Sequence, residues 1–215
     1  MASDFNVASA TLGTTPLAED VAIYERVEGS TVVSLELEDI LQDSVAVSKI
    51  DFYATNEEGE ISVLLLNDVT GNAYTYGRLT FGQEAVPGLG EESSDTYNQT
   101  IGVENSSSDG SQMYVSGLGA GYPTYGGIAV TADGKVAALA EVTRVAGVSR
   151  SDFDGTDYVV VDGLQVPIAQ NVQVYNTETE QWTTLEEAKS YASSFTVYYD
   201  RTLSDGGQIR IILTE

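Results

Sequence analysis

The stretch Pro167–Tyr175, PIAQNVQVY, has a close counterpart in the same chain. PLAEDVAIY spans Pro16–Tyr24, 151 residues earlier, and its proline, one alanine, one valine and its tyrosine are identical. The residues after each phrase are also similar: SLELEDIL, KIDFYATN, a Glu-Gly turn and EISVLLL after the first, and TLEEAKSYA, FTVYYDR, a Gly-Gly turn and QIRIIL after the second. This order of elements predicts two copies of one structural unit.

The repeated phrase favours a structural role. Proline cannot donate a ladder hydrogen bond, so it suits the beginning of a strand. The valine and tyrosine positions that come after it alternate in the way that places side chains on one face of a strand. We therefore expect each phrase to begin the same strand in two tandem modules.

The rest of the chain is typical of β structure. Asp-Gly pairs at 109–110, 133–134 and 162–163 supply the positive φ angles that tight hairpins need. Short strands between such turns predict a mostly β fold of two tandem small barrel or sandwich modules, with at most one short helix in each. In the second copy the element order also allows an OB-type barrel, and other small barrels and sandwiches stay open.

One helix is expected near 184–192. Thr184 is a good N-cap, and Glu187, three residues later, completes the pattern of a capping box. In the first copy, VVSLELEDIL fits either a helix or a strand. Trp182, just before the expected helix, is predicted to fill the core over the start of that helix.

The predicted domain organisation follows the repeat. Residues 1–70 form the first β module, and residues 71–215 form the second. The second includes a β region at 71–150 rich in glycine, serine and tyrosine, and the C-terminal repeat unit at 158–215. Residues 82–96, with turn formers, acids and no periodicity, are the best candidate for a loop or linker. The division of 71–150 between the modules stays open.

The charge excludes several classes of function. With 33 acidic against 9 basic residues, the formal net charge is −24. Nucleic-acid binding needs a cationic surface, and attraction to an anionic membrane needs one too, so neither partner is expected. No apolar run approaches the roughly 18 residues that cross a bilayer. The chain is expected to be either cytosolic or a mature piece of an exported protein.

The sequence lacks the commonest catalytic residues. It has no cysteine and no histidine, which removes disulfides, thiolate and histidine metal sites, and Ser-His or Cys-His nucleophiles. Carboxylate pairs of the kind that glycoside hydrolases use need only be about 5–10 Å apart in space, so the sequence cannot identify one. We expect the chain not to be an enzyme, with a carboxylate-based hydrolase as the weakest alternative.

Two groups of residues are candidates for ligands. Asp152, Asp154 and Asp157 surround a glycine turn, and clustered carboxylates can bind Ca²⁺, so Ca²⁺ is the one cofactor that the sequence suggests. The alternative is an acidic surface turn, because the EF-hand spacing is absent. Tyrosines of the glycine-rich middle region, above all Tyr114, Tyr122 and Tyr125, could form a sugar-binding platform. The alternative is ordinary, half-buried strand tyrosines.

The C-terminal block, from VVVDGLQVPIAQNVQVYN through TLEEAKSYA to FTVYYDRTLSDGGQIRIILTE, resembles a known class of module. It is similar to the β-rich repeat modules of S-layer-homology-domain surface proteins from Gram-positive (Firmicutes) gut bacteria. DVTGNAYTYG and GGIAVTADGKVAAL also look like connecting segments of such proteins. The S-layer-homology repeats themselves are not visible. The resemblance implies an extracellular location, as a piece of a larger exported protein without its signal and anchoring repeats, and it carries over no catalytic residue.

Taken together, these observations predict a non-catalytic structural or adhesive module of a bacterial cell-surface, S-layer-associated protein. The alternative is a domain that binds carbohydrate or cell-wall polymer. The expected partners are cell-wall polysaccharide or other modules of surface proteins.

Overall fold

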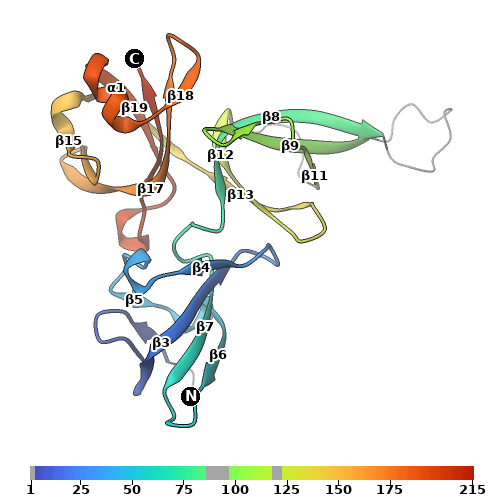
Figure 1. Ribbon diagram of the computed structural model, residues 1–215, viewed down its shortest axis with the longest axis vertical. Helices are drawn as coiled ribbons and strands as arrows, with labels where there is room; N and C mark the ends of the chain where they lie inside the picture. Colours follow the sequence, from blue (N-terminus) through green and yellow to red (C-terminus); the bar gives the residue numbers. More distant parts are fainter. Residues whose placement is uncertain (1–2, 86–96, 118–122) are drawn as a thin grey trace. The chain divides into compact units, whose positions relative to one another are not determined.

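The computed structural model describes residues 3–85, 97–117 and 123–215, and its regular structure there is mostly β (Figure 1). The strands form three sheets, and α1 (Leu185–Tyr191) is the one α-helix in these ranges. The prediction of a mostly β fold is therefore confirmed. The chain divides into two compact units. Unit 1 comprises residues up to Ala73 together with Thr202–Gly207, and unit 2 comprises Tyr74–Arg201 and Gln208–Glu215.

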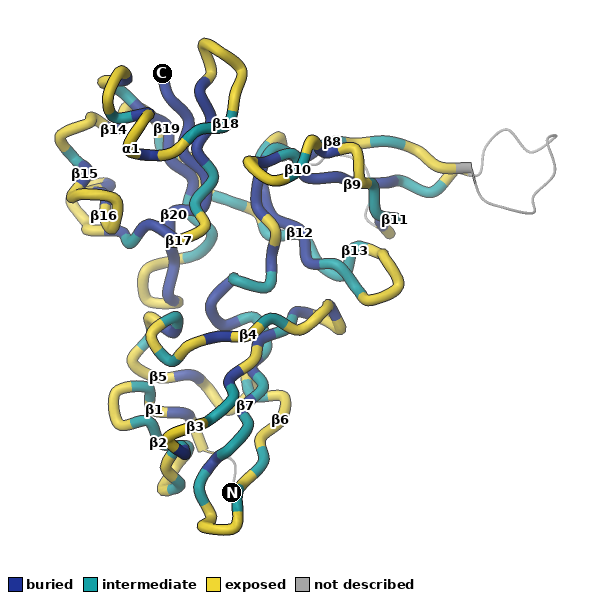
Figure 2. The backbone as a smooth tube through the Cα atoms, viewed as in Figure 1, coloured by how far each residue is buried: buried dark blue, intermediate teal, exposed yellow. Residues whose placement is uncertain are grey.

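Unit 1 is built around the strand that holds the first copy of the repeated phrase. Its sheet has the order β5-β1-β2-β3-β7-β6, and β4 also pairs with β3. β3 and β7 are parallel, and both contain buried segments (Figure 2). The buried Phe5, Ile23 and Leu64 lie in one core. The elements are β1 (Phe5–Asn6), β2 (Thr11–Leu12), β3 (Thr15–Arg26), β4 (Val33–Leu35), η1 (Leu37–Asp39), β5 (Ser44–Val45), η2 (Val47–Lys49), β6 (Ile50–Thr55), β7 (Ile61–Asn67) and η4 (Leu203–Asp205), where η denotes a 3₁₀ turn.

The middle sheet of unit 2 has the order β10-β9-β8-β12-β13, and β11 also pairs with β9. Its small core contains Leu79, Ile101, Val103 and Ile128. The hairpin expected at residues 133–134 is present between β12 and β13. The strands are β8 (Thr75–Ala85), β9 (Tyr97–Asn105), β10 (Ser108–Asp109), β11 (Tyr114–Ser116), β12 (Tyr125–Val130) and β13 (Val136–Glu141).

The loop predicted at 82–96 begins too early. Residues 82–85 continue β8 and pair with residues 97–100 of β9, so the backbone ladder extends into the polar residues from which the loop was predicted. Residues 86–96 lie outside the described part of the chain.

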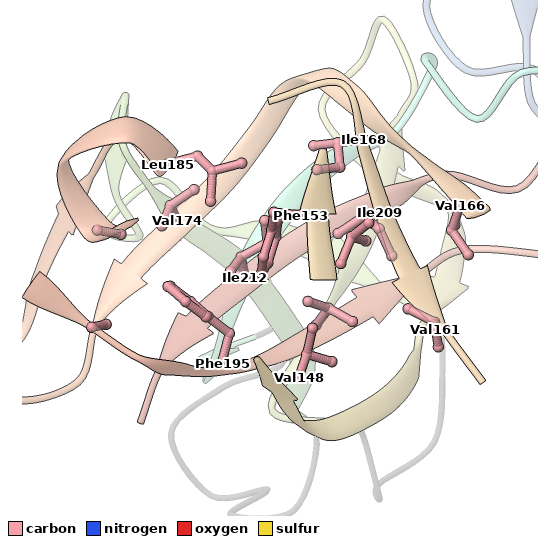
Figure 3. Packing of buried hydrophobic residues seen from close by; sticks show 14 residues of the cluster. Val148, Phe153, Val161, Val166, Ile168, Val174, Leu185, Phe195, Ile209 and Ile212 are labelled. Atoms are coloured by element: carbon pink, nitrogen blue, oxygen red, sulfur yellow. The ribbon is translucent and has the colours of Figure 1, made fainter. Parts of the chain in front are cut away.

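The C-terminal sheet has the order β14-β19-β20-β17-β16-β15, with β18 paired to β17. Its core is the largest of the three, and Figure 3 shows its side chains converging between the strands and α1. The rings of Phe153 and Phe195 meet edge to face with centroids 5.0 Å apart. The elements are β14 (Thr143–Ser149), η3 (Arg150–Asp152), β15 (Phe153–Asp154), β16 (Tyr158–Val161), β17 (Leu164–Asn176), β18 (Gln181–Thr183), α1, β19 (Ser194–Tyr199) and β20 (Ile209–Thr214).

One continuous segment, 143–154, joins both edges of this sheet. Its first part, β14, pairs with β19, and its last part, β15, pairs with β16. β17 and β20 are parallel, while the other neighbours are antiparallel. This is the strand order of an OB-type barrel, the order that the sequence allowed. The segment 143–154 therefore closes the barrel, and we call it the closing segment.

The two copies of the repeated phrase occupy equivalent places. Tyr24 of β3 pairs with Leu65 of the parallel strand β7, and Tyr175 of β17 pairs with Leu213 of the parallel strand β20. In each pair of strands the register shifts once, between the proline end and the tyrosine end of the phrase. A short antiparallel partner comes after each phrase, β4 in one sheet and β18 in the other. The two sheets thus share one local topology.

The connection after that partner differs between the copies. In unit 2 it is α1, where the Thr184 hydroxyl accepts a hydrogen bond from the Glu187 amide at 3.2 Å. The Glu187 carboxylate accepts from the Thr183 hydroxyl at 2.6 Å, so the capping box predicted with Thr184 forms only its first half. In unit 1 the segment that fitted either a helix or a strand contains β4 followed by the 3₁₀ turn η1.

Candidate functional site

Two of the three tyrosines predicted to bind a ligand, Tyr114 and Tyr125, lie on different strands of the middle sheet. Tyr114 lies on β11 and packs against the core of the middle sheet. Tyr125 lies on β12, and its ring is 5.2 Å from that of Tyr198. β9 and β8 separate the two strands in the sheet. Partial burial raises the pKa of the Tyr125 phenol. Tyr122 lies outside the described residues.

The three aspartates predicted to bind Ca²⁺ are not brought together as a cation site. The Asp152 carboxylate accepts a hydrogen bond from the Ser149 amide at 2.9 Å and so caps η3. Asp154 and Asp157 are exposed at the turn between β15 and β16. Across the described ranges, no three acidic side chains form a group that could hold a metal ion. The arrangement is that of an acidic surface turn.

A cavity of about 220 Å³ lies beside Tyr114 on the middle sheet. Its wall combines one aromatic ring with amide and hydroxyl groups, a mixture that suits hydrogen bonding to a sugar. The Asn105 amide is already used, because it donates to the Tyr76 carbonyl at 3.1 Å and its oxygen accepts from the Ser107 amide. The lining residues are Thr75, Val103, Asn105, Ser107, Ser108, Gln112, Tyr114, Ile128 and Val130.

Within unit 2, an ion pair and two aromatic rings join the middle sheet to the barrel. Arg78 of β8 pairs with Glu104 of β9 at 2.5 Å, and its guanidinium lies 5.3 Å from the centroid of the Tyr175 ring. The hydrogen bond that Arg78 donates to the Glu104 carboxylate raises the pKa of Arg78. Trp182 donates to Glu104 at 3.2 Å, and its ring is 4.9 Å from that of Tyr175.

The prediction for Trp182 is therefore wrong in its location. Its side chain is half-buried against the middle sheet rather than filling the core over α1, because its indole N–H finds a carboxylate partner on β9. Leu185 and Ala188 of α1 supply the buried contacts that the sequence interpretation assigned to Trp182.

A second polar cluster, which also lies between the middle sheet and the barrel of unit 2, is almost fully buried. The Arg210 guanidinium donates to the Asp200 carboxylate at 2.8 Å, and their side chains are 0% and 1% exposed. The Tyr76 hydroxyl donates to the same carboxylate at 3.3 Å, and its ring lies 5.0 Å from the Arg210 guanidinium. Burial raises the pKa of Tyr76 well above its ordinary value. Sequence reasoning missed this cluster, although a single arginine inside the apolar run QIRIIL was a usable signal.

Unit 1 also contains a buried carboxylate with donors around it. Glu25 of β3 is 0% exposed, and it accepts from the Thr70 amide at 2.6 Å, from the Thr70 hydroxyl at 2.5 Å and from the Val69 amide. A buried carboxylate saturated by hydrogen-bond donors fixes the chain that supplies them. Here it anchors the segment that comes after β7.

A groove of about 470 Å³ runs beside β6 in unit 1. One wall is β6 itself, where Phe52 and Tyr53 are 55% and 53% exposed. The other wall is the turn between β2 and β3. The lining residues are Ser3, Leu12, Gly13, Thr14, Thr15, Val47, Ile50, Asp51, Phe52, Tyr53 and Ile61. The adjacent aromatics in KIDFYATN were the sequence signal for this surface.

The described part of the chain contains no helix with the length and hydropathy needed to span a membrane. No protein-family model matches the chain, and no curated protein or solved structure is significantly similar to it.

Proposed function

We propose that this chain is a non-catalytic structural or adhesive module of a bacterial cell-surface protein, displayed outside the cell as part of a larger exported protein. The observation that carries the proposal is the duplication: two sheets with the same parallel strand pair and the same register shift occur in one chain. Repeated structural units are typical of proteins that extend or assemble rather than catalyse. The resemblance to S-layer-associated repeat modules supports the location.

The polar clusters support the same proposal. The pairs Arg210–Asp200 and Arg78–Glu104 join strands of unit 2, and Glu25 anchors a segment of unit 1. Each group is satisfied by protein partners, which is what structural ion pairs require. The net charge of −24 suits a solvated surface and disfavours a nucleic-acid partner. The proposed partners are wall polysaccharide or other modules of surface proteins.

Co-sedimentation with purified Gram-positive cell walls tests this proposal. An unrelated protein of equal acidity serves as the control, and each mixture is run with and without calcium. We expect no calcium-dependent retention and no release of reducing ends from the wall polymer. Release of reducing ends that tracks the purified chain would overturn the non-catalytic proposal. Labelling of intact producing cells by an antibody against the chain tests the location, and labelling only after lysis would contradict it.

Carbohydrate binding is the second candidate, and the cavity beside Tyr114 favours it. If this cavity binds a wall-derived sugar, Gln112→Ala should weaken retention on cell walls at least about tenfold, the effect of one lost directional hydrogen bond in a binding site. Tyr97→Ala is the matched control, because Tyr97 is 51% exposed on β9 and is not among the residues that line the cavity. Equal retention of both variants and the unchanged chain would exclude this cavity as the sugar site.

A further inference from the structure

We infer that the cavity beside Tyr114 binds a neutral sugar that carries a methyl group, with this methyl group on the apolar floor of the cavity. The inference rests on the second candidate function, because it names the class of sugar that the same cavity takes. N-acetylated and 6-deoxy sugars belong to this class, whereas sugars with hydroxyl groups alone do not.

The cavity lies on the core face of the middle sheet, at the end where β8 begins. β8, β9 and β12 are neighbours in this sheet (Figure 1), and Thr75 at the start of β8 pairs with Ile128 of β12. β11, which holds Tyr114, pairs with β9, and an isolated bridge from Val115 to Lys135 also brings it beside β13. The sheet thus curls round its core, and the cavity is lined from several of its strands.

The floor of the cavity is apolar, and it consists of the aliphatic lining residues Val103, Ile128 and Val130. Val103 and Ile128 are 5% and 2% exposed in the core of this sheet, and Val130 packs against that core. A ligand hydroxyl placed on this floor would lose its hydrogen bonds to water without replacement, whereas a methyl group is stabilised by leaving water. The part of the ligand that reaches the floor should therefore be a methyl group.

The rim of the cavity is polar and fixed in place. It consists of Thr75, Ser107, Ser108, Gln112 and Tyr114. The Ser108 hydroxyl accepts from the Gly110 amide at 3.3 Å, while the side chains of the other four have no hydrogen-bond partner in the described part of the chain. The buried Asn105 holds the rim, because its side-chain oxygen accepts from the Ser107 amide at 2.9 Å. Hydroxyl and amide groups that both donate and accept suit the ring hydroxyls of a sugar.

The surroundings of the cavity favour a neutral ligand. None of the described lining residues is charged. Asp109 directly follows Ser108, and its carboxylate accepts from the Ser111 hydroxyl at 2.6 Å and the Ser111 amide at 2.9 Å. These hydrogen bonds lower the pKa of the Asp109 carboxyl, so it is ionised at neutral pH. A carboxylate next to the rim, without a cation in the lining, disfavours sugars that carry carboxylate or phosphate groups.

Titration of the full chain with two pairs of monosaccharides, followed by saturation-transfer NMR, tests the inference. N-acetylglucosamine is compared with glucose, and L-fucose with L-galactose, so that each pair differs by one methyl-bearing group. We expect the methyl-bearing member of at least one pair to bind at least about tenfold more tightly than its counterpart, because the counterpart places a hydroxyl on the floor. Saturation should be strongest at the methyl protons, and the pair that shows the preference identifies the source of the methyl group.

The negative outcomes are distinguishable from one another. Binding of both members of each pair with equal affinity would overturn the inference and leave carbohydrate binding as the second candidate function. Absence of binding by all four sugars would overturn both. Neither outcome depends on wall co-sedimentation or on hydrolysis, so the proposal of a non-catalytic module is tested separately.

A substitution on the floor locates the methyl group. Val130→Thr keeps the shape of the side chain but adds a hydroxyl to the floor, so the methyl preference should fall from about tenfold to about twofold or less. The matched control is Val136→Thr, because Val136 pairs with Val130 and packs against the same core but is not among the lining residues. Loss of the preference in both variants, or in neither, would overturn the inference.

Ser107→Ala keeps the test decisive if Val130→Thr disturbs folding. Ser107 is exposed on the rim, so its substitution should leave the fold intact. We expect it to weaken binding of both members of the preferred pair by the same factor, at least about threefold, because it removes a contact to the ring hydroxyls and not to the methyl group. Unchanged binding of both members would place the sugar elsewhere and overturn the inference.

Discussion

Replacing Arg210 by methionine should destabilise unit 2 strongly. The substitution keeps the side chain's approximate length but leaves Asp200, which is 1% exposed, without its closest cationic partner at 2.8 Å. Removing one member of a buried ion pair costs about 3–5 kcal/mol, because the other charge stays buried and unpaired. Arg201 lies 3.8 Å from the same carboxylate and the Gln208 amide still donates to it, so we expect the lower end, about 3 kcal/mol.

The assay is urea unfolding followed by Trp182 fluorescence. Trp182 is the chain's one tryptophan and lies in unit 2, so its emission reports the unit that contains the substitution. The matched control is Arg144→Met, because Arg144 is 59% exposed and lies 3.9 Å from Glu215. An exposed pair of this kind contributes at most about 1 kcal/mol.

A double variant separates the charge from the packing. Asp200→Asn with Arg210→Met removes both charges, and it should recover much of the stability lost in the single variant. A loss below about 1 kcal/mol in Arg210→Met, or a double variant that is much less stable than the single one, would refute the reasoning that an unpaired buried charge dominates.

Three further predictions concern single contacts in unit 2. Burial raises the pKa of Tyr76, so the unfolded chain loses the phenol proton at a lower pH than the folded chain does, and the free energy of unfolding should fall as pH rises above about 10. Tyr76→Phe should make this fall less steep in alkaline urea titrations, and an unchanged pH dependence would contradict the prediction. Gly163→Ala should lower the free energy of unfolding by about 1 kcal/mol, because a residue with a side chain is strained at the Gly163 φ of +79° even though no atom lies within 4 Å of the added carbon. An unchanged free energy of unfolding would contradict this. Glu104→Ala should cost about 1–2 kcal/mol and change Trp182 emission, because it removes the indole's acceptor and the partner of Arg78; unchanged emission would show that the indole bond is absent in solution.

The sequence was informative where one short stretch determines the structure. The hairpin at residues 162–163 forms because both residues accept positive φ, at 50° and 79°. The helix at 185–191 begins where the Thr184 cap predicts it, since capping depends on residues three positions apart. The repeated phrase located the parallel strand pair in both copies, although that pairing itself could be seen only in the structure.

The candidate sites depended on distant pairings that the sequence does not state. Tyr114 and Tyr125 are eleven residues apart in the chain, but Tyr114 lies on β11, which pairs with β9, and Tyr125 lies on β12, which pairs with β8 and β13. Asp152 caps η3 instead of joining a cation site, and the signal for this role was Ser149 three residues earlier. Trp182 lies against a carboxylate 78 residues away in sequence, a partner that no local pattern could indicate.

The open edge of β6 required both the repeat and the structure to be recognised. Sequence comparison aligns the strands, but only the sheet order shows that β14 lies beside β19 and that β6 ends its sheet.

Amide hydrogen exchange of the unmodified chain tests this account most directly. β19 has a strand on each side, so its amides should all exchange slowly, whereas β6 has one partner, so alternate amides should exchange rapidly while their neighbours are protected by β7. Rapid exchange at alternate β6 positions would agree with one closed barrel and one open strand edge in the same chain. Uniformly slow exchange along β6, at protein concentrations where the chain is monomeric, would contradict it.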